Sequence, residues 1–397
     1  MNRIASCLIV CAIANVPCIP AAGAATEAVV YSFRGYPIDG ATPVAGVIGV
    51  DGTLYGTTSS GGTNSLDGGT VFSLNPATGT ETVLHSFCTP ECEDGANPEA
   101  GLTDVKGTLY STTEGGGSYD DGTVFSVDPA TGAETVLYDF YEYGNGDAYY
   151  PLAGLIHSGD LLYGTTVGGG YAGNSGTVFS VNPRTGTEVV RYDFCSQEGC
   201  YDGERPIAGL IDVNGTLYGT TVNGGTHDNR GTVFSLDPKT RSETVVYSFC
   251  AQLYCADGEE PYAGLVSAKG TGTLYGTTYY GGTYGRGTVF SVDPATGLET
   301  VLHSFASSGP DGEYPDAGLV EEGGKLYGTT TEGGADGGGT IFSIDLVTGA
   351  ERVRHSFGSG ADGSVPLAAL QNVGGTLFGT TADGGAYGYG TVFSFKP

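Results

Sequence analysis

An aspartate that recurs seven times is the most regular acidic feature of the sequence. Each copy lies four residues before a proline, and six of the seven precede a glycine. A ring of carboxylates would suit a cation such as Ca²⁺, or sugar hydroxyls. The same pattern is typical of a turn in which Asp accepts hydrogen bonds from its own loop before a fixed Pro. We favour the turn, because every repeat needs it, and predict no metal site. The seven are Asp39, Asp94, Asp147, Asp202, Asp257, Asp311 and Asp362.

The six aspartates that precede glycine are kept as candidate cation ligands. A second set of candidates follows the recurrent "GTT" and "GG" motifs, where polar and aromatic residues differ from one copy to the next. Tyrosine rings stack on the CH faces of sugars, while Asn, Asp and Arg form directional hydrogen bonds with hydroxyls. The alternative is that these tyrosines pack over neighbouring glycine-rich loops. The candidate ligand-binding residues are Tyr119, Tyr171, Asn174, His227, Arg230, Tyr284, Arg286 and Tyr387.

Enzyme chemistry has weaker support in the sequence. Three of the five histidines, His85, His303 and His355, occupy one repeat position where other copies have Tyr, and we interpret them as framework residues. A polysaccharide lyase would need a base and a charge neutraliser. His227 with Arg230, Tyr171 and Tyr284 has suitable side chains, but no motif brings them together. We find no nucleophile motif, phosphate-binding loop or metal-ligand cluster, so we assign no catalytic residue and favour a non-enzymatic role.

These residues belong to a repeat that fills most of the chain. "GTLYGTT" at 52–58 recurs with small changes seven times in all, and "GTVFS" or "GTIFS" also occurs seven times. One unit contains four short segments with strand-like composition: "AGLI" and the residues after it, "TLYGTT", "TVFSLD" and a segment such as "ETVVYSF". The turn "DPATG" between the last two has Pro and Gly where a type I turn and a left-handed residue need them. Arg241 replaces that Gly in the fourth unit.

Four strands in each unit predict the blade of a β-propeller. A solenoid would need polar capping repeats, and none is present. The seventh unit ends after its third strand, while "EAVVYSF" at 27–33 matches the fourth. We therefore predict an all-β, seven-bladed β-propeller with four antiparallel strands per blade, closed by the N-terminal strand. With strand one innermost, the connections between blades and the loops from strand two to strand three should share one face.

Composition and charge define the setting of this propeller. Residues 1–25 are predicted to be a signal peptide, with Arg3, an apolar run and small residues around Ala22–Gly23–Ala24, which leaves 26–397 as one propeller domain. A net charge of −29 disfavours nucleic acid and anionic membranes. Outside the predicted signal peptide the chain has six cysteines. They form close pairs that we predict to be disulfides in a secreted, periplasmic or cell-surface protein. The pairs are Cys88 and Cys92, Cys195 and Cys200, and Cys250 and Cys255.

The long motif "GTLYGTT", followed by "GTVFSLDP" and "ETVVYSF", resembles the GloVer tandem repeat of exported bacterial proteins. The resemblance covers essentially all of residues 27–397. It implies export and a repeat architecture, and it implies no particular activity. The repeats are also broadly similar to Kelch-like blades, but the Kelch tryptophan is missing because the chain contains no Trp.

We therefore expect an exported propeller that acts as a binding or scaffold module, for carbohydrate or for a cell-surface protein. The alternative is a carbohydrate-active enzyme, such as a polysaccharide lyase with its site in the central funnel, and a third possibility is a purely structural surface protein. We expect a monomer without a cofactor, without membrane insertion and without nucleic-acid partners. An enzyme should gather unlike polar residues in one sector of the ring, whereas a lectin should have several similar pockets between blades.

Overall fold

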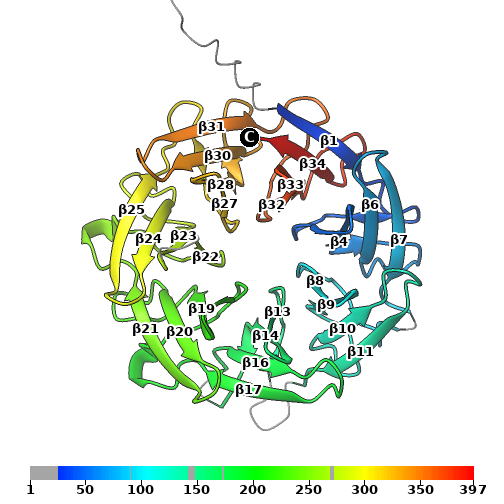
Figure 1. Cartoon of the computed structure of the whole chain (residues 1–397), viewed down its shortest axis with the longest axis horizontal. Helices are drawn as coiled ribbons and strands as arrows, with labels where there is room; N and C mark the ends of the chain where they lie inside the picture. Colours follow the sequence, from blue (N-terminus) through cyan, green and yellow to red (C-terminus); the bar gives the residue numbers. More distant parts are fainter. Residues whose placement is uncertain (1–25, 90, 142–147, 172–173, 269–271) are drawn as a thin grey trace, which may run out of the picture.

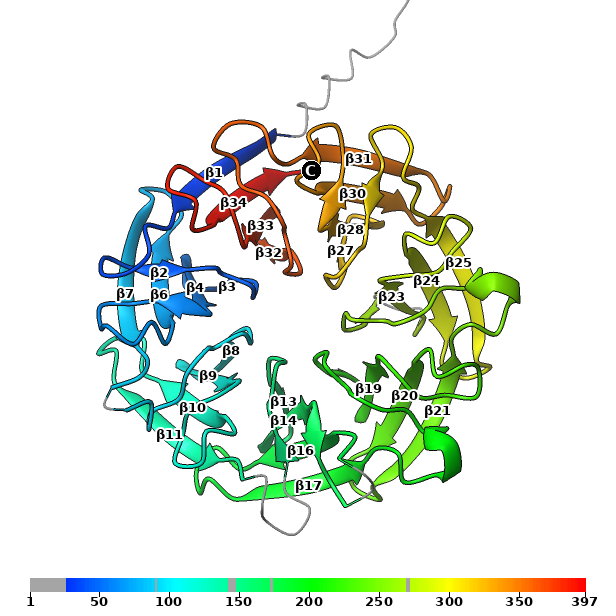
Figure 2. The same cartoon turned by 180° about the vertical axis from the view of Figure 1, so that it is seen from behind.

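The computed structural model describes residues 26–397, except 90, 142–147, 172–173 and 269–271. The predicted signal peptide, residues 1–25, lies outside the described residues, as does Asp147. Seven sheets of four antiparallel strands stand around a central axis (Figures 1 and 2). The predicted seven-bladed β-propeller is confirmed. Within the described part of the chain there is no helix with the length and apolar character needed to span a bilayer.

The innermost strand of each blade is short. Its expected start was wrong, because the strand begins after the "AGL" segment and not within it. That segment packs closely against its counterpart in the neighbouring blade: a Cβ added to Gly46 would lie 2.8 Å from the carbonyl oxygen of Ala369. The innermost strands are β3 (Ile48–Val50), β8 (Thr103–Val105), β13 (Ile156–Ser158), β18 (Ile211–Val213), β22 (Val266–Ser267), β27 (Val320–Glu322) and β32 (Gln371–Val373).

The second strand of each blade is formed by the "TLYGTT" motif. Its glycine allows a close approach, since a Cβ on Gly56 would lie 2.6 Å from the Phe72 ring of the next strand. The last threonine of the motif is buried and contacts the first threonine of the third strand, as Thr58 does with Thr70 at 2.8 Å. The second strands are β4 (Thr53–Thr58), β9 (Thr108–Thr113), β14 (Leu161–Thr166), β19 (Thr216–Thr221), β23 (Leu274–Thr278), β28 (Lys325–Thr330) and β33 (Thr376–Thr381).

The third strand is the most buried of each blade. Its successive side chains point alternately toward the preceding blade and toward the following blade. In the first blade, Val71, Phe72 and Leu74 are all 0 % exposed. Strands rich in Val, Phe and Thr fit such a surface that is buried on both sides. The third strands are β6 (Thr70–Asn75), β10 (Thr123–Val127), β16 (Thr177–Val181), β20 (Thr232–Asp237), β24 (Thr288–Asp293), β30 (Thr340–Asp345) and β34 (Thr391–Lys396).

The outermost strand pairs with the third through a shift in register near its middle; in the first blade the shift lies between Val71 and Phe72. Such a bulge bends the strand and increases its twist. The turn before this strand keeps a left-handed residue, which is Gly79 with φ 68° in the first blade and Arg241 with φ 60° in the fourth. The outermost strands are β7 (Thr80–Ser86), β11 (Glu134–Asp139), β17 (Glu188–Asp193), β21 (Ser242–Ser248), β25 (Leu298–Ser304), β31 (Glu351–Ser356) and β1 (Thr26–Ser32).

The hydrophobic core lies between the blades. A phenylalanine just after each outermost strand contacts the phenylalanine of the third strand in the next blade, as Phe194 does with Phe234, with ring centroids 4.9 Å apart. Leu210, Leu217 and Leu236 complete this interface. Because every blade needs the apolar face of its neighbour, a single blade could not bury its own core.

The ring is closed by β1, which pairs antiparallel with β34 from Thr26 opposite Lys396 to Ser32 opposite Thr391. In Figure 1 the blue first strand lies beside the red last strand. Each blade also donates a hydrogen bond from a strand-two threonine to the segment that leads into the next blade. At the closure Thr380 donates to the carbonyl of Ala45 at 3.0 Å, across 335 residues of sequence. The closing interface thus repeats the contacts of the others.

Candidate functional site: the tyrosine-rich face

Two kinds of loop share one face of the ring, as expected. The loop that enters a blade pairs with the loop between its second and third strands. These pairs form small sheets in three blades, where β2 (Gly40–Ala41) pairs with β5 (Ser60–Gly61), β12 (Ala148–Tyr149) with β15 (Gly168–Gly169), and β26 (Gly312–Glu313) with β29 (Glu332–Gly333). In the other four blades a single bridge joins the two loops, such as Glu259 with Tyr280.

This face carries the exposed tyrosines. At the tip of its inter-blade loop Tyr254 is 89 % exposed, and in a loop between strands two and three Tyr171 is 74 % exposed. We call this surface the tyrosine-rich face. Its exposed tyrosines are Tyr36, Tyr119, Tyr150, Tyr171, Tyr201, Tyr254, Tyr280, Tyr284, Tyr387 and Tyr389.

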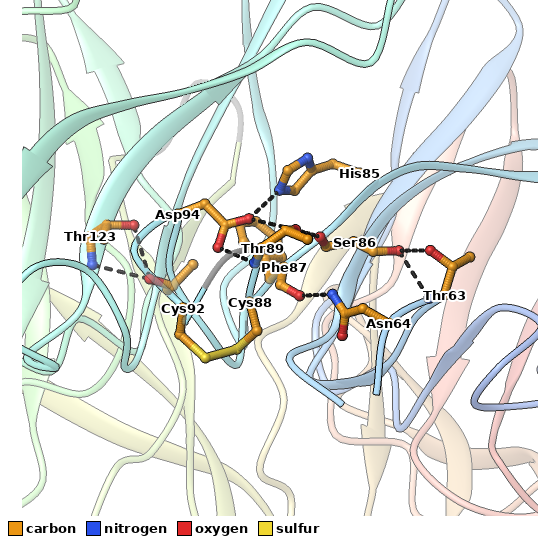
Figure 3. Close-up of polar contacts among 11 residues, drawn as sticks. Thr63, Asn64, His85, Ser86, Phe87, Cys88, Thr89, Cys92, Asp94 and Thr123 are labelled. Carbon is orange, nitrogen blue, oxygen red and sulfur yellow. Dashed lines mark hydrogen bonds and ion pairs between the residues drawn. A yellow bond between two sulfur atoms is a disulfide. The ribbon is translucent and has the colours of Figure 1, made fainter. Parts of the chain in front are cut away.

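All three predicted disulfides are formed, in three of the loops that join one blade to the next: Cys88–Cys92, Cys195–Cys200 and Cys250–Cys255. Figure 3 shows the first of them beside Asp94. Two of these loops contain a single turn of 3₁₀ helix, η1 (Glu198–Cys200) and η2 (Leu253–Cys255). Each disulfide closes a loop of a few residues, so it shapes that loop and leaves the contacts between blades to other side chains.

The six described aspartates of the repeat lie at six different blade interfaces and do not converge on one site. Each accepts a hydrogen bond from a backbone N–H of its own loop, as Asp257 does from Ala251 at 2.9 Å. Each also contacts the Tyr or His of the preceding outermost strand, as Asp257 does with the Tyr247 hydroxyl at 2.7 Å. The other described members are Asp39, Asp94, Asp202, Asp311 and Asp362.

A glutamate that our sequence interpretation missed faces each of these aspartates. It begins the outermost strand of the following blade, so that Glu299 faces Asp257. Burial, and then the charge of Asp257, raises the pKa of Glu299 to about 7. Burial followed by Asp39 does the same for Glu81, and burial followed by Asp202 for Glu243. The repeat therefore places pairs of mutually repelling carboxylates between the blades, and we call their glutamates the glutamate ring.

The predicted ligand-binding residues are distributed around the ring. Tyr119 packs against Tyr141 with ring centroids 4.3 Å apart. Asn174 accepts a hydrogen bond from the Gly169 N–H at 2.7 Å and so holds its own loop. His227 contacts the hydroxyl of its neighbour Thr226 at 3.1 Å. These contacts are local to single blades.

The two predicted arginines and the last predicted tyrosine contact the next inter-blade loop. Arg230 forms ion pairs with Glu259 at 3.1 Å and Glu260 at 3.0 Å. Tyr387 lies under the guanidinium of Arg34, which is 5.6 Å from the ring centre. Tyr171 and Tyr284 project into solvent, with exposed fractions of 74 % and 62 %.

Arg286 leads to the most developed aromatic site that the described residues contain. Its guanidinium carbon lies 5.0 Å from the ring centre of Tyr314, and its Nε is 3.3 Å from Glu313. Tyr279 stacks on Tyr314 at 5.0 Å with ring planes 22° apart. Tyr280 meets the Tyr279 ring edge-on at 4.7 Å. We call Tyr262, Tyr279, Tyr280 and Tyr314 the tyrosine cluster; Tyr262 joins it at 5.0 Å from Tyr279.

The tyrosine cluster is specific to the interface between blades five and six. After "GTT" the fifth unit has Tyr279 and Tyr280, where the third unit has Val167 and Gly168. Sequence reasoning missed it because the four tyrosines come from three separate segments, each of which looks unremarkable by itself. A position-by-position alignment of the seven units would have shown the excess of aromatic residues in this one.

An acidic group lies beside the tyrosine cluster. Burial raises the pKa of Asp316 to about 6. The pKa of Tyr279 is raised by burial and then by the charge of Asp316, and the pKa of Tyr262 is raised by burial and then by Glu260 and Asp316. Both phenols are therefore protonated at neutral pH and can donate hydrogen bonds. The site thus combines aromatic faces, phenolic donors, the guanidinium of Arg286 and carboxylate acceptors.

A second, simpler aromatic pocket lies where the ring closes. It has a volume of about 390 Å³ and is bounded by two exposed tyrosines on opposite sides of the closure. The lining residues are Tyr36, Ala41, Thr42, Ser60, Ser65, Asp67 and Tyr389. The tyrosine-rich face therefore offers more than one aromatic surface, and the tyrosine cluster is the one with the densest set of rings.

Fold and loops together define a seven-bladed β-propeller repeat protein with an aromatic loop face. A family model described as the Gloeobacter/Verrucomicrobia repeat matches residues 19–229, 66–271 and 229–397, and the chain belongs to that family. No curated protein matches the chain significantly.

Several solved structures share the fold. An extracellular domain from B. thetaiotaomicron has a TM-score of 0.57 and 9 % identity, and the match covers 90 % of this chain and 39 % of that one. An oligogalacturonate lyase in complex with manganese has a TM-score of 0.53 and 13 % identity, covering 94 % and 90 % of the two chains. A europium-containing methanol dehydrogenase has a TM-score of 0.53 and 12 % identity, covering 94 % and 93 %. At such identities the likeness concerns the fold alone.

Proposed function

We propose that this protein is an exported carbohydrate-binding propeller, and that the tyrosine cluster is its main binding surface. The observation that carries the proposal is the stack of Tyr279 and Tyr314 with the partly exposed ring of Tyr280 at its edge. Aromatic rings present flat apolar faces for the CH groups of a sugar, and the phenol groups beside them form hydrogen bonds with hydroxyls. The disulfides support export, because such bonds persist in oxidising compartments.

The charge of the protein favours a neutral polysaccharide as the ligand. The net charge is −29, and a long-range negative potential repels polyuronates and sulfated glycans. At the tyrosine cluster the guanidinium of Arg286 is paired with Glu313. The charge of Arg205 also acts on Tyr262, where it is opposed by Glu260 and Asp316.

Affinity electrophoresis and calorimetry with neutral and acidic polysaccharides would test this function. We expect binding to a neutral glycan that weakens about tenfold or more in Tyr280→Ala, since loss of one stacking ring removes on the order of 1.4 kcal/mol. Tyr254→Ala is the matched control, because Tyr254 is an exposed tyrosine of the same face outside the tyrosine cluster. Equal affinity of wild type and Tyr280→Ala for every bound glycan would refute the assignment to this surface.

A carbohydrate-active enzyme is the second candidate, and one observation favours it. Asp316, with its pKa raised to about 6, lies near Tyr262 and Tyr279 in the sector where unlike polar residues gather. A carboxyl group with such a pKa suits general acid or base catalysis near neutral pH. The test is product analysis after incubation with polysaccharides. Ultraviolet-absorbing unsaturated products that are lost in Asp316→Asn would establish a lyase, and intact polymer after long incubation would exclude it.

A further inference from the structure

Three of the seven blade interfaces contain a histidine in addition to the aspartate and the glutamate. His85 Nε2 lies 3.0 Å from Asp94 Oδ2, as Figure 3 shows. His303 Nε2 lies 3.3 Å from Asp311 Oδ2, and His355 Nε2 lies 3.1 Å from Asp362 Oδ2. The third member comes from the outermost strand of the next blade and is Glu134, Glu351 and Glu27, respectively.

The geometry of one of these sets matches a metal site. In the set of His303, Asp311 and Glu351, one ligand atom of each residue lies within 4.8 Å of the other two. Tetrahedral zinc binds His nitrogen and carboxylate oxygen at about 2.0–2.2 Å, which places the ligand atoms about 3.3 Å apart. The observed His–Asp distances of 3.0 to 3.3 Å are already of that size. Small movements of the glutamate side chain would complete a site with three protein ligands.

The glutamates at these interfaces are buried. The side chain of Glu27 is 8 % exposed, and its Oε2 lies 3.9 Å from His355 Nε2. The Oε1 of Glu351 is buried and accepts no hydrogen bond from any residue of the described chain, and the same is true of Oε1 in the corresponding glutamates, both beside histidine, as in Glu27, and beside tyrosine, as in Glu299. A buried carboxylate oxygen without a partner is unfavourable, and coordination to a cation would satisfy it.

We propose that His303, Asp311 and Glu351 bind a divalent transition-metal ion with the preferences of zinc; among the described residues this is the set that brings three ligand atoms within 4.8 Å of one another. Imidazole nitrogen with carboxylate oxygen is a donor set that suits zinc, whereas Ca²⁺ takes oxygen ligands. The histidines are 18 % to 22 % exposed, so an ion can reach them from solvent. A water molecule would fill the fourth position of the site.

The other four interfaces provide a control within the same molecule. They have tyrosine in place of the histidine, at Tyr31, Tyr138, Tyr192 and Tyr247. Burial and the hydrogen bond to Asp257 raise the pKa of the Tyr247 hydroxyl, so that it remains a protonated donor. A neutral phenol is a poor metal ligand, and the proposal assigns no zinc to these interfaces.

Zinc titration by isothermal calorimetry, on protein without a polyhistidine tag, tests the proposal. We expect one saturable Zn²⁺ site in the wild type, none in His303→Tyr, and an unchanged site in the control variant His85→Tyr. Tyrosine is compatible with this position, as four other blades show, so the variants should fold, and melting in EDTA checks this. Glu351→Gln keeps the shape of the side chain and should weaken the site more than tenfold.

Two results would overturn the proposal. One is a wild-type protein that binds no Zn²⁺ saturably, or a His303→Tyr variant that binds as many ions as the wild type. The other is displacement of Zn²⁺ by equimolar Ca²⁺, which would show that the histidine nitrogen does not contribute. Hydrogen exchange gives a second readout, because Glu351 lies on β31: zinc should slow exchange in β31 in the wild type and have no such effect in His303→Tyr.

Discussion

The ring of Phe33 packs edge-on against Phe72, with centroids 5.1 Å apart and planes at 71°. Phe33 follows the first strand of the chain, and that strand belongs to the last blade, whereas Phe72 lies in the first blade. The contact is therefore the closing version of one that every neighbouring pair of blades makes, such as Phe249 with Phe290 at 5.0 Å. The N-terminal strand thus brings to the closure both its hydrogen-bonding edge and the aromatic ring that the next blade needs.

Removal of the Phe33 ring should weaken the closure. Phe33→Ala creates a cavity at a fully buried position, and such changes reduce the free energy of unfolding by about 3–5 kcal/mol. We expect a lower melting temperature and faster proteolysis that starts at β1. Deletion of residues 27–33 should have a larger effect, because β34 would then be left as an open edge.

Phe194→Ala is the matched control for the closure, since Phe194 makes the equivalent contact inside the ring. It should destabilise to a similar extent without making the N-terminus the first site of cleavage. If the deletion mutant melted at the same temperature as the full protein, β1 would not be needed for closure.

The fourth unit has an arginine where the turn before its outermost strand favours a glycine. Arg241 has φ 60°, where the equivalent residue of the first unit is Gly79 with φ 68°. A side chain in this left-handed region is disfavoured by about 1 kcal/mol relative to glycine. Arg241→Gly should therefore raise the free energy of unfolding by about that amount in denaturant titrations. The reverse change, Gly79→Arg, should lower it by a similar amount, and equal stability of both variants and the wild type would contradict the argument.

The disulfides should contribute little to the stability of the ring. The loop closed by Cys250 and Cys255 has a sequence separation of 5, for which the chain-entropy contribution is about 2 kcal/mol at most. Cys250→Ser with Cys255→Ser should leave the far-ultraviolet circular dichroism unchanged and lower the melting temperature by only a few degrees. Cleavage by proteases should increase within residues 250–255 specifically. Unfolding of the whole ring on reduction would show that the disulfides hold the blades together.

The repeat motifs predicted the architecture because each depends on a local rule. Alternating Val, Phe and Thr specify strands, and the match of "EAVVYSF" to the missing strand specifies closure. The tyrosine cluster and the glutamate ring were missed because both arise between blades. Tyr314 reaches Tyr279 from 35 positions away, and Glu299 faces an aspartate of the preceding blade. Only the packing angle of neighbouring blades brings such residues together, and a single unit does not encode that angle.

The glutamate ring should make the metal-free protein more stable in mild acid than in mild base. The pKa of Glu299 is about 7 in the folded protein, against an ordinary value of 4.5, so the folded state binds the proton more tightly. The resulting stabilisation is present below about pH 4.5 and is lost as the pH rises through about 7. Glu81 and Glu243 act in the same direction.

Glu299→Gln tests this sign, because glutamine stays neutral at every pH. In EDTA, the variant should melt higher than the wild type at pH 8, and its melting temperature should change less between pH 5 and pH 8 than that of the wild type. Glu198→Gln, at an exposed position, should keep the wild-type pH dependence. If Glu299→Gln instead lowered the melting temperature at pH 8, the surroundings of Glu299 would stabilise its ionised carboxylate. The hydrogen bond from the Tyr247 hydroxyl, which lowers the pKa of Glu299, would then outweigh burial and the charge of Asp257.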